Sequence, residues 1–321
     1  MKTYNQVSLL FFILEVSVLV PNIILACSGS FRDHLDPANS QLYILSTIID
    51  ILTYLNSFAT TRIPLNASKD GPPFLISFIE LFPRDSITGT FLLTFLHLFH
   101  FTFAHDQLLL NLIILANRFS LAFHKVYAQK FWTQWSWPLV LGAIIYSIAM
   151  SWPIIWNNES YYEYKENQDR YQLTTTTPRE LYYFPLGFTS VIVTVSNTIL
   201  MIKTISRIFR FKKANISVPK CRLFLFVMIS VVADYFLTII TVFNVYLTIW
   251  PATSESDFLF GFSRAIPYVI PFASDSLTLT RPILFLLFNW NRKTGRKPKG
   301  KSSVEALNQR FRMNKISPVI S

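Results

Sequence analysis

Charged residues and glycines are scarce in this chain. Only 15% of the 321 residues are charged and eight are glycine, whereas hydrophobic residues make up 51% and phenylalanine alone occurs 30 times. A soluble domain carries about 25% charged residues, so this composition excludes an ordinary soluble protein. The few glycines also argue against close, glycine-mediated contacts as the main means of helix association in a membrane.

Cysteines and catalytic motifs are equally sparse. The two cysteines, Cys27 and Cys221, lie at ends of apolar stretches that we place on the cytosolic side, where thiols stay reduced. An outer disulfide is therefore excluded, so the polar, Tyr-rich segment 157–181 must be held by packing, a glycan or a ligand. A Gly-rich phosphate loop, a nucleophile elbow and a zinc-protease helix are all absent from the sequence, so we expect neither an enzyme nor a cofactor.

The apolar residues are gathered into seven stretches, each long enough to cross a bilayer as a helix. Backbone groups in hydrocarbon must be hydrogen-bonded within the segment, and these stretches are too long for barrel strands. We therefore predict an all-α membrane protein, a seven-transmembrane helix bundle, with a shorter segment at 74–82 lying at the interface or in a loop. The predicted spans are 7–27, 39–60, 91–117, 136–156, 183–203, 223–250 and 262–290.

The distribution of Lys and Arg predicts the orientation. With the N-terminus outside, 20 of the 29 basic residues fall on the cytosolic side, as the positive-inside rule requires. Residues 1–292 then form the membrane domain and 293–321 a basic cytoplasmic tail. The sequons at Asn66 and Asn158 fall outside, where glycosylation is expected, and Asn215 falls inside. A cleaved signal peptide at 1–27 is the alternative, but it would leave six spans and expose the basic tail.

Ionisable groups inside a bilayer are costly, so those within the spans are candidates for function. We expect a polar network of Asp50, Asn111, Asp234, Asp275 and Arg281. An ion pair between Arg281 and Asp50 or Asp275 would offset the cost of burying the guanidinium. The alternative is that Arg281 extends to the inner interface.

The outer half of the third span predicts a ligand pocket. His100 and Phe103 are placed to line it, with Asp106 deeper, and the aromatic residues Tyr246 and Tyr268 form its wall. The competing interpretation of these aromatic residues is an interfacial belt.

The histidines of the third span do not predict a metal site. His97 and His100 share a helix face, but His105 lies on a different face, so no third ligand is provided.

Three segments carry a resemblance to a known family. They are Gln-Leu-Leu-Leu-Asn at 107–111, Asn-Arg-Phe-Ser at 117–120 and Ser-Asp-Ser-Leu-Thr-Leu-Thr-Arg-Pro at 274–282. With the seven-span layout, the chain resembles the nematode serpentine chemoreceptors of class gamma or a sister class such as class V. The resemblance implies a G-protein-coupled receptor fold, chemosensory detection of a small molecule, coupling to a heterotrimeric G protein, and a plasma-membrane or sensory-cilium location.

The resemblance also assigns a signalling motif. Arg118, between Asn117 and Phe119, takes the role of the arginine in the Asp-Arg-Tyr motif of rhodopsin-like receptors, while Pro282 and Phe285 stand where those receptors have Asn-Pro-x-x-Tyr. Asn117 replaces the acid, so the ionic restraint between neighbours is absent. On spacing alone, Arg118 is also explained as an interfacial residue whose side chain extends to the headgroups.

Three functions remain open at the level of sequence. We expect a receptor in the lipid bilayer with an unidentified small-molecule ligand and no nucleic-acid partner. The alternative from another class is a transporter or ligand-gated channel that uses the intramembrane acids, although the scarce glycines and the absence of repeats argue against it. A scaffold that binds no ligand is the third.

Overall fold

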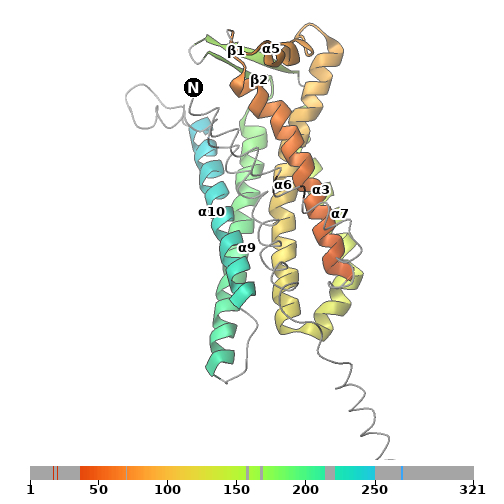
Figure 1. Ribbon diagram of the computed structural model, residues 1–321, viewed down its shortest axis with the longest axis vertical. Helices are drawn as coiled ribbons and strands as arrows, with labels where there is room; N and C mark the ends of the chain where they lie inside the picture. The colour runs from red at the N-terminus through yellow and green to blue at the C-terminus, as the bar shows by residue number, and fades with distance from the viewer. Residues whose placement is uncertain are drawn as a thin grey trace, which may run out of the picture. The chain divides into compact units, whose positions relative to one another are not determined.

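The computed structural model describes residues 37–69, 71–156, 159–166, 169–213 and 221–249, together with three isolated residues, 17, 20 and 269. The predicted first and seventh spans and the basic tail therefore lie outside the described residues. The described part is mostly helical, with one small sheet (Figure 1). Its elements are α3 (Pro37–Ser57), the π-helix η1 (Phe58–Arg62), α4 (Ile63–Asn66), α5 (Pro73–Glu80), α6 (Ile87–Phe123), α7 (Lys125–Ser151), α8 (Pro153–Trp156), β1 (Ser160–Lys165), β2 (Arg170–Thr175), α9 (Glu180–Lys213) and α10 (Cys221–Ile249).

Three of the described helices are long and apolar enough to cross a membrane. The qualifying segments are Ile87–Leu121 in α6, Glu180–Arg207 in α9 and Met228–Leu247 in α10. Large apolar side chains are exposed on these helices and on α7, including Phe91, Ile145, Ile192 and Ile239. Polar side chains such as Asp234 are buried instead. This is the arrangement expected of a protein whose solvent is lipid.

Helix α6 is the central element of the described part. It packs against α3, α7 and α9, while α9 in turn packs along α10 (Figure 1). Leu108 of α6, Val193 of α9 and Ala233 of α10 form a shared core cluster. The middle of the third predicted span therefore contacts the fifth and sixth, which lets a change at one end of α6 reach its neighbours.

At the end of the bundle that carries Arg118, three helices extend beyond the predicted spans. Helix α6 continues from the predicted end at 117 to Phe123, α7 begins at Lys125 rather than 136, and α9 runs to Lys213 rather than 203. These extensions contain no Gly or Pro, and their Arg and Lys residues are good helix formers. Only His124, with its non-helical backbone (φ −139°, ψ 49°), separates α6 from α7.

The segment 157–181, predicted to lie outside the membrane, contains a β-hairpin, which corrects the expectation of an all-α protein. Strands β1 and β2 pair antiparallel, from Ser160 opposite Thr175 to Lys165 opposite Arg170. The alternating Tyr and Thr residues favour strands, and this signal could have been found in the sequence. The predicted interfacial segment at 74–82 forms the short helix α5, which lies beside the hairpin (Figure 1).

Packing and hydrogen bonds hold the hairpin in place. The Tyr162 hydroxyl donates to the carbonyl of Ala59 (3.0 Å), and the Ser160 backbone N–H donates to Thr94 Oγ1 (3.0 Å). The Arg84 guanidinium lies 4.2 Å from the centre of the Tyr161 ring, in a cation–π contact. Of the three means of restraint considered from the sequence, packing is the one seen in the structure.

Candidate ligand cavity and polar core

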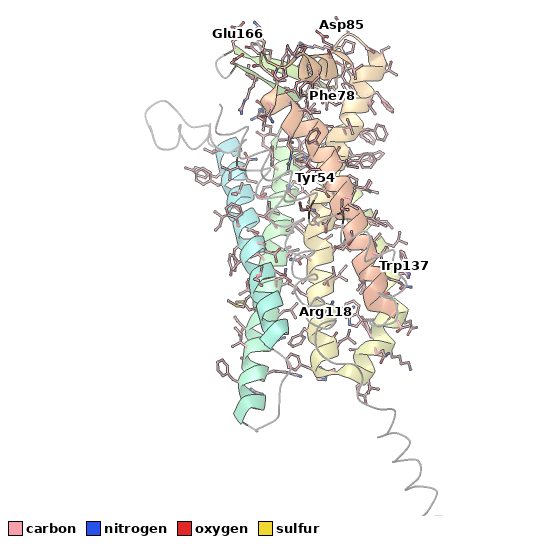
Figure 2. The ribbon with its side chains drawn as sticks, in the orientation of Figure 1. Tyr54, Phe78, Asp85, Arg118, Trp137 and Glu166 are labelled. Atoms are coloured by element: carbon pink, nitrogen blue, oxygen red, sulfur yellow. The ribbon has the colours of Figure 1, made fainter. Side chains whose placement is uncertain are left out.

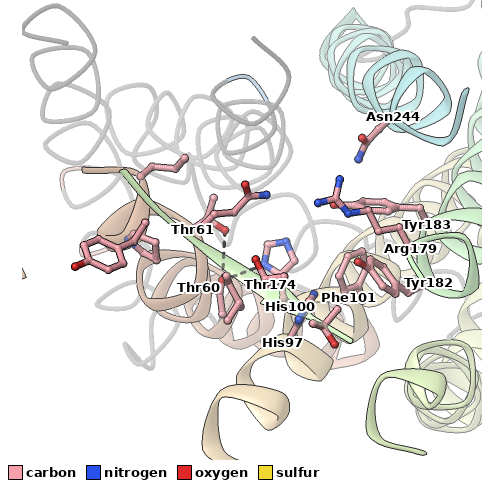
Figure 3. Close-up of a pocket in the computed structure, with 16 residues that line it drawn as sticks. Thr60, Thr61, His97, His100, Phe101, Thr174, Arg179, Tyr182, Tyr183 and Asn244 are labelled. Atoms are coloured by element: carbon pink, nitrogen blue, oxygen red, sulfur yellow. Dashed lines mark hydrogen bonds between the residues drawn. The ribbon is translucent and has the colours of Figure 1, made fainter. Parts of the chain in front are cut away.

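A cavity of about 150 Å³ lies beneath the hairpin, among η1, α4, α6, β2, α9 and α10 (Figure 3). A second cavity of about 60 Å³ shares five of its lining residues and continues along α6 as far as Gln107. The residues common to both are Thr61, His100, Phe101, Tyr183 and Asn244. Together the two cavities form a site that begins at the hairpin and reaches the polar core.

The π-helix η1 positions two threonines at the cavity. Pro64 has no N–H to donate to the carbonyl of Thr60, so the regular α-helical hydrogen-bond ladder cannot pass this point. The Ile63 N–H instead donates to the carbonyl of Phe58, five residues back. The wider turn places both Thr60 and Thr61 in the cavity wall. Single-turn π-helices are often found at functional sites, but this one was not anticipated from the sequence.

Two histidines of α6 contribute polar atoms to the cavity wall. His100 Nδ1 lies 3.3 Å from Thr60 Oγ1, and His97 Nδ1 lies 3.4 Å from Ser160 Oγ of the hairpin. The Phe101 ring packs against Tyr182 with 4.6 Å between the ring centres. The cavity thus combines rings with a few fixed polar groups, as small-molecule sites commonly do.

Of the predicted ligand-contacting residues, His100 lines both cavities, but Phe103, Asp106 and Tyr246 line neither. Phe103 stacks on Phe99 on a neighbouring face of α6, with 5.5 Å between ring centres. Asp106 is buried, and the side chain of Tyr246 is exposed on α10. Tyr268 lies outside the described residues.

Most of the lining residues were not identified from the sequence. The hairpin, η1 and the start of α9 supply them, and long-range folding alone brings these segments together. The described lining residues that the prediction missed include Thr60, Thr61, Phe101, Gln172, Thr174, Arg179, Tyr182, Tyr183 and Asn244.

Below the cavities, a carboxylate joins three helices. Asn111 Nδ2 on α6 donates to Asp234 Oδ1 and Oδ2 on α10 (2.8 and 3.0 Å). Asn197 Nδ2 on α9 donates to Asp234 Oδ2 (2.6 Å). All three side chains are almost fully buried. Two of the predicted network residues are therefore in contact, and Asn197 completes the cluster.

A second carboxylate joins α3 to α6 one turn nearer the cavity. Gln107 Nε2 donates to Asp50 Oδ1 (3.0 Å), and Ser46 Oγ lies 3.5 Å from Asp50 Oδ2. Since Gln107 also lines the smaller cavity, it connects the site to the polar core. The predicted ion pair of Asp50 or Asp275 with Arg281 cannot be followed, because Asp275 and Arg281 lie outside the described residues.

Arg118 lies near the opposite end of α6 from the cavity (Figure 2), within the helix rather than at its end. Its side chain is half-buried, and the preceding Asn117 is buried with an amide that makes no hydrogen bond in the described part of the chain. Phe119 packs on Phe123, with 5.0 Å between ring centres. The other two motif residues, Pro282 and Phe285, lie outside the described residues.

The extended end of α9 contacts the end of α6 that carries Arg118. Arg207 Nη1 donates to His124 Nε2 (2.9 Å), and its guanidinium carbon lies 5.3 Å from the centre of the Phe123 ring. On the α7 side, Trp132 Nε1 donates to Ser120 Oγ (2.6 Å). The segment 118–124 is therefore held from two sides.

Of the two outer sequons, Asn66 is described. It ends α4, and its Nδ2 donates to the carbonyl of Arg62 (2.7 Å). Asn158 and the inner Asn215 lie outside the described residues.

In the described hairpin, three pKa values depart from their ordinary range, and burial raises the pKa of the first, that of the Tyr162 hydroxyl. A hydrogen bond from the Lys165 ammonium lowers the pKa of Glu163, and the Glu163 carboxylate also accepts from Thr174 Oγ1 across the strands (3.1 Å). The Tyr164 hydroxyl donates to the Asp169 carboxylate, which raises the pKa of Tyr164 to about 12. Both interactions stabilise the hairpin that covers the cavity.

The buried polar core, the exposed apolar flanks and the cavity at one end indicate a helical membrane protein with a site for a small molecule. The chain belongs to the Srg family of chemoreceptors, whose family model matches residues 6–294. It is also similar to serpentine receptor class gamma-31 of Caenorhabditis elegans, with 24% identity over 288 residues that cover 89% of this chain and 86% of that protein. The resemblance to class gamma serpentine receptors is thus confirmed, and the chain is a membrane chemoreceptor with a role in signal transduction.

Proposed function

We propose that this chain is a chemosensory G-protein-coupled receptor that binds a small molecule in the two connected cavities and signals through the opposite end of α6. Seven spans with the N-terminus outside, in the plasma membrane of a sensory cell or its cilium, form part of the proposal. Its main support is that one continuous helix, α6, carries the cavity residue His100, the network residues Gln107 and Asn111, and Arg118.

The polar core supplies the elements that a ligand could bias. A ligand shifts a conformational equilibrium only through a difference in its affinity for the two states. Gln107 touches the smaller cavity and donates to Asp50, while Asn111 lies one turn further along α6 and donates to Asp234. Rotation or translation of α6 driven by a ligand would change both contacts, and with them the packing of α6 on α3 and α10.

The inner end offers a basic surface to a G protein. Helix α9 continues beyond the predicted fifth span, through Arg207 and Arg210 to Lys213. In the proposed orientation, the basic segment 206–222 lies on the same side of the membrane as Arg118. In the described arrangement, Arg207 contacts His124 and Phe123. Separation of α9 from α6 would release these contacts and open the surface around Arg118.

The alternative is a transporter or ligand-gated channel. The buried carboxylates of Asp50 and Asp234 favour it, because acids at membrane depth often mark ion pathways. Each of these two carboxylates accepts amide hydrogen bonds that link helices, which equally supports a structural role in a receptor.

The test is the Arg118→Ala variant, expressed in cells with a reporter of G-protein activation and exposed to a panel of small odorants. We expect normal surface expression and loss of both basal and ligand-evoked signalling. Lys130→Ala, which removes an exposed charge on the inner part of α7, is the matched control and should signal normally. Signalling retained by Arg118→Ala would refute the assigned role, and ion flux that persists without G proteins would favour the alternative.

A further inference from the structure

The hydrogen bonds around Thr60 determine which nitrogen of His100 carries the proton. Thr60 Oγ1 lies 2.8 Å from the carbonyl oxygen of Asn56, which can only accept, so the single hydroxyl proton of Thr60 is donated there. The 3.3 Å contact between Thr60 Oγ1 and His100 Nδ1 then requires that Nδ1 carries a proton and donates it. His100 contacts no carboxylate among the described residues, and an unpaired buried charge is costly, so the ring is neutral.

A neutral imidazole protonated at Nδ1 has a lone pair at Nε2. Nε2 lies across the ring from Nδ1, on the side away from Thr60 (Figure 3), and His100 lines both cavities. The nitrogen available to a molecule at the junction of the cavities is therefore an acceptor. A ligand that presents its own acceptor there would leave two lone pairs facing each other.

We propose that His100 selects ligands that carry a hydroxyl group, which donates a hydrogen bond to Nε2 at the junction of the two cavities. Thr60 is the positioning residue, because it holds the imidazole in the accepting tautomer. The ring faces of Phe101 and Tyr183, which line both cavities, surround the rest of the ligand. The ligand class is thus a small, largely apolar alcohol or phenol. This inference rests on the proposed ligand site, but it does not depend on coupling to a G protein.

The test measures direct binding to the purified full-length receptor in lipid nanodiscs, without a G protein. The probes are matched pairs that differ in the donor: cyclohexanol and cyclohexanone, phenol and anisole, and benzyl alcohol and benzaldehyde. A hydrogen bond left unmet at an acceptor that the bound ligand covers costs enough to predict roughly 10- to 100-fold tighter binding of each hydroxyl compound. Equal or tighter binding of the partners that lack the donor, or no binding of any probe at millimolar concentration, would overturn the proposal.

Four variants test whether the preference for hydroxyl compounds comes from the tautomer of His100 or only from the presence of its ring. His100→Asn keeps a donor near Thr60 but has no atom at the Nε2 position, so the preference for hydroxyl compounds should disappear. His100→Gln places an amide there that can donate or accept, so both members of each pair should bind about equally. Thr60→Val keeps the side-chain shape but releases the tautomer, which should reduce the preference. Thr204→Val is the matched control: the Thr204 hydroxyl of α9 also donates to a carbonyl four residues back, that of Leu200 (2.7 Å), but Thr204 lines neither cavity, so the preference should be unchanged.

The same samples distinguish this proposal from the proposed function. A hydroxyl preference that falls in Thr60→Val and keeps its wild-type size in Thr204→Val supports the assignment of the tautomer even if the receptor activates no G protein. A preference of wild-type size in Thr60→Val would show that Thr60 does not position the ring. Thermal unfolding of each unliganded variant verifies that folding is intact, because a merely structural effect would lower the affinity for both members of a pair alike.

Discussion

The contact between Asn111 and Asp234 should be among the strongest links between the helices of this receptor. Asn111 Nδ2 donates to both carboxylate oxygens of Asp234, at 2.8 and 3.0 Å, in a place where both side chains are almost fully buried. A hydrogen bond to a charged group contributes about 1.5–3 kcal/mol, whereas interhelical hydrogen bonds in membranes average about 0.6 kcal/mol. We therefore expect a coupling free energy of about 1.5–3 kcal/mol between Asn111 and Asp234.

The measurement is a double-mutant cycle of Asn111→Leu, Asp234→Leu and the double variant, read from unfolding of the purified receptor in detergent. The matched control is the cycle of Thr194→Val and Thr238→Val, whose hydroxyl oxygens lie 2.7 Å apart between α9 and α10 and carry no charge. Its coupling should be about 0.6 kcal/mol. A coupling between Asn111 and Asp234 no larger than that of the control would refute the reasoning.

Two further predictions concern the outer side. The pKa of Glu163 is lowered in the folded hairpin from its ordinary value of 4.5, so its contribution to stability is present above that value and is lost as the pH falls through the folded-state pKa. The protection factors of the hairpin amides, which correct for the pH dependence of intrinsic exchange, should fall on acidification, and less so in Glu163→Gln; an identical pH profile in the variant would exclude this role. Glycosidase-sensitive glycans should be found at Asn66 or Asn158 and not at Asn215; a glycan at Asn215 would reverse the proposed orientation.

The helices of the described part were largely predictable from the sequence, because a bilayer-spanning helix must be a long apolar run whatever it packs against. Their inner ends were not, since α6, α7 and α9 continue into polar residues that hydropathy does not count as span. Asn111 and Asp234 could be named as buried polar residues by their position in these runs. Their pairing could not, because they lie 123 residues apart in the chain.

The sequence by itself determined the membrane class, the positions of the helices and the receptor family, because hydrophobic length and local motifs are properties of continuous segments. Only the tertiary structure decided which residues form the cavity. The hairpin over α6 and the contact between Thr60 and His100 each depend on segments that are distant in the chain. Phe103 was predicted to line the cavity but does not, because it lies on a neighbouring face of α6 and its ring stacks on Phe99 instead.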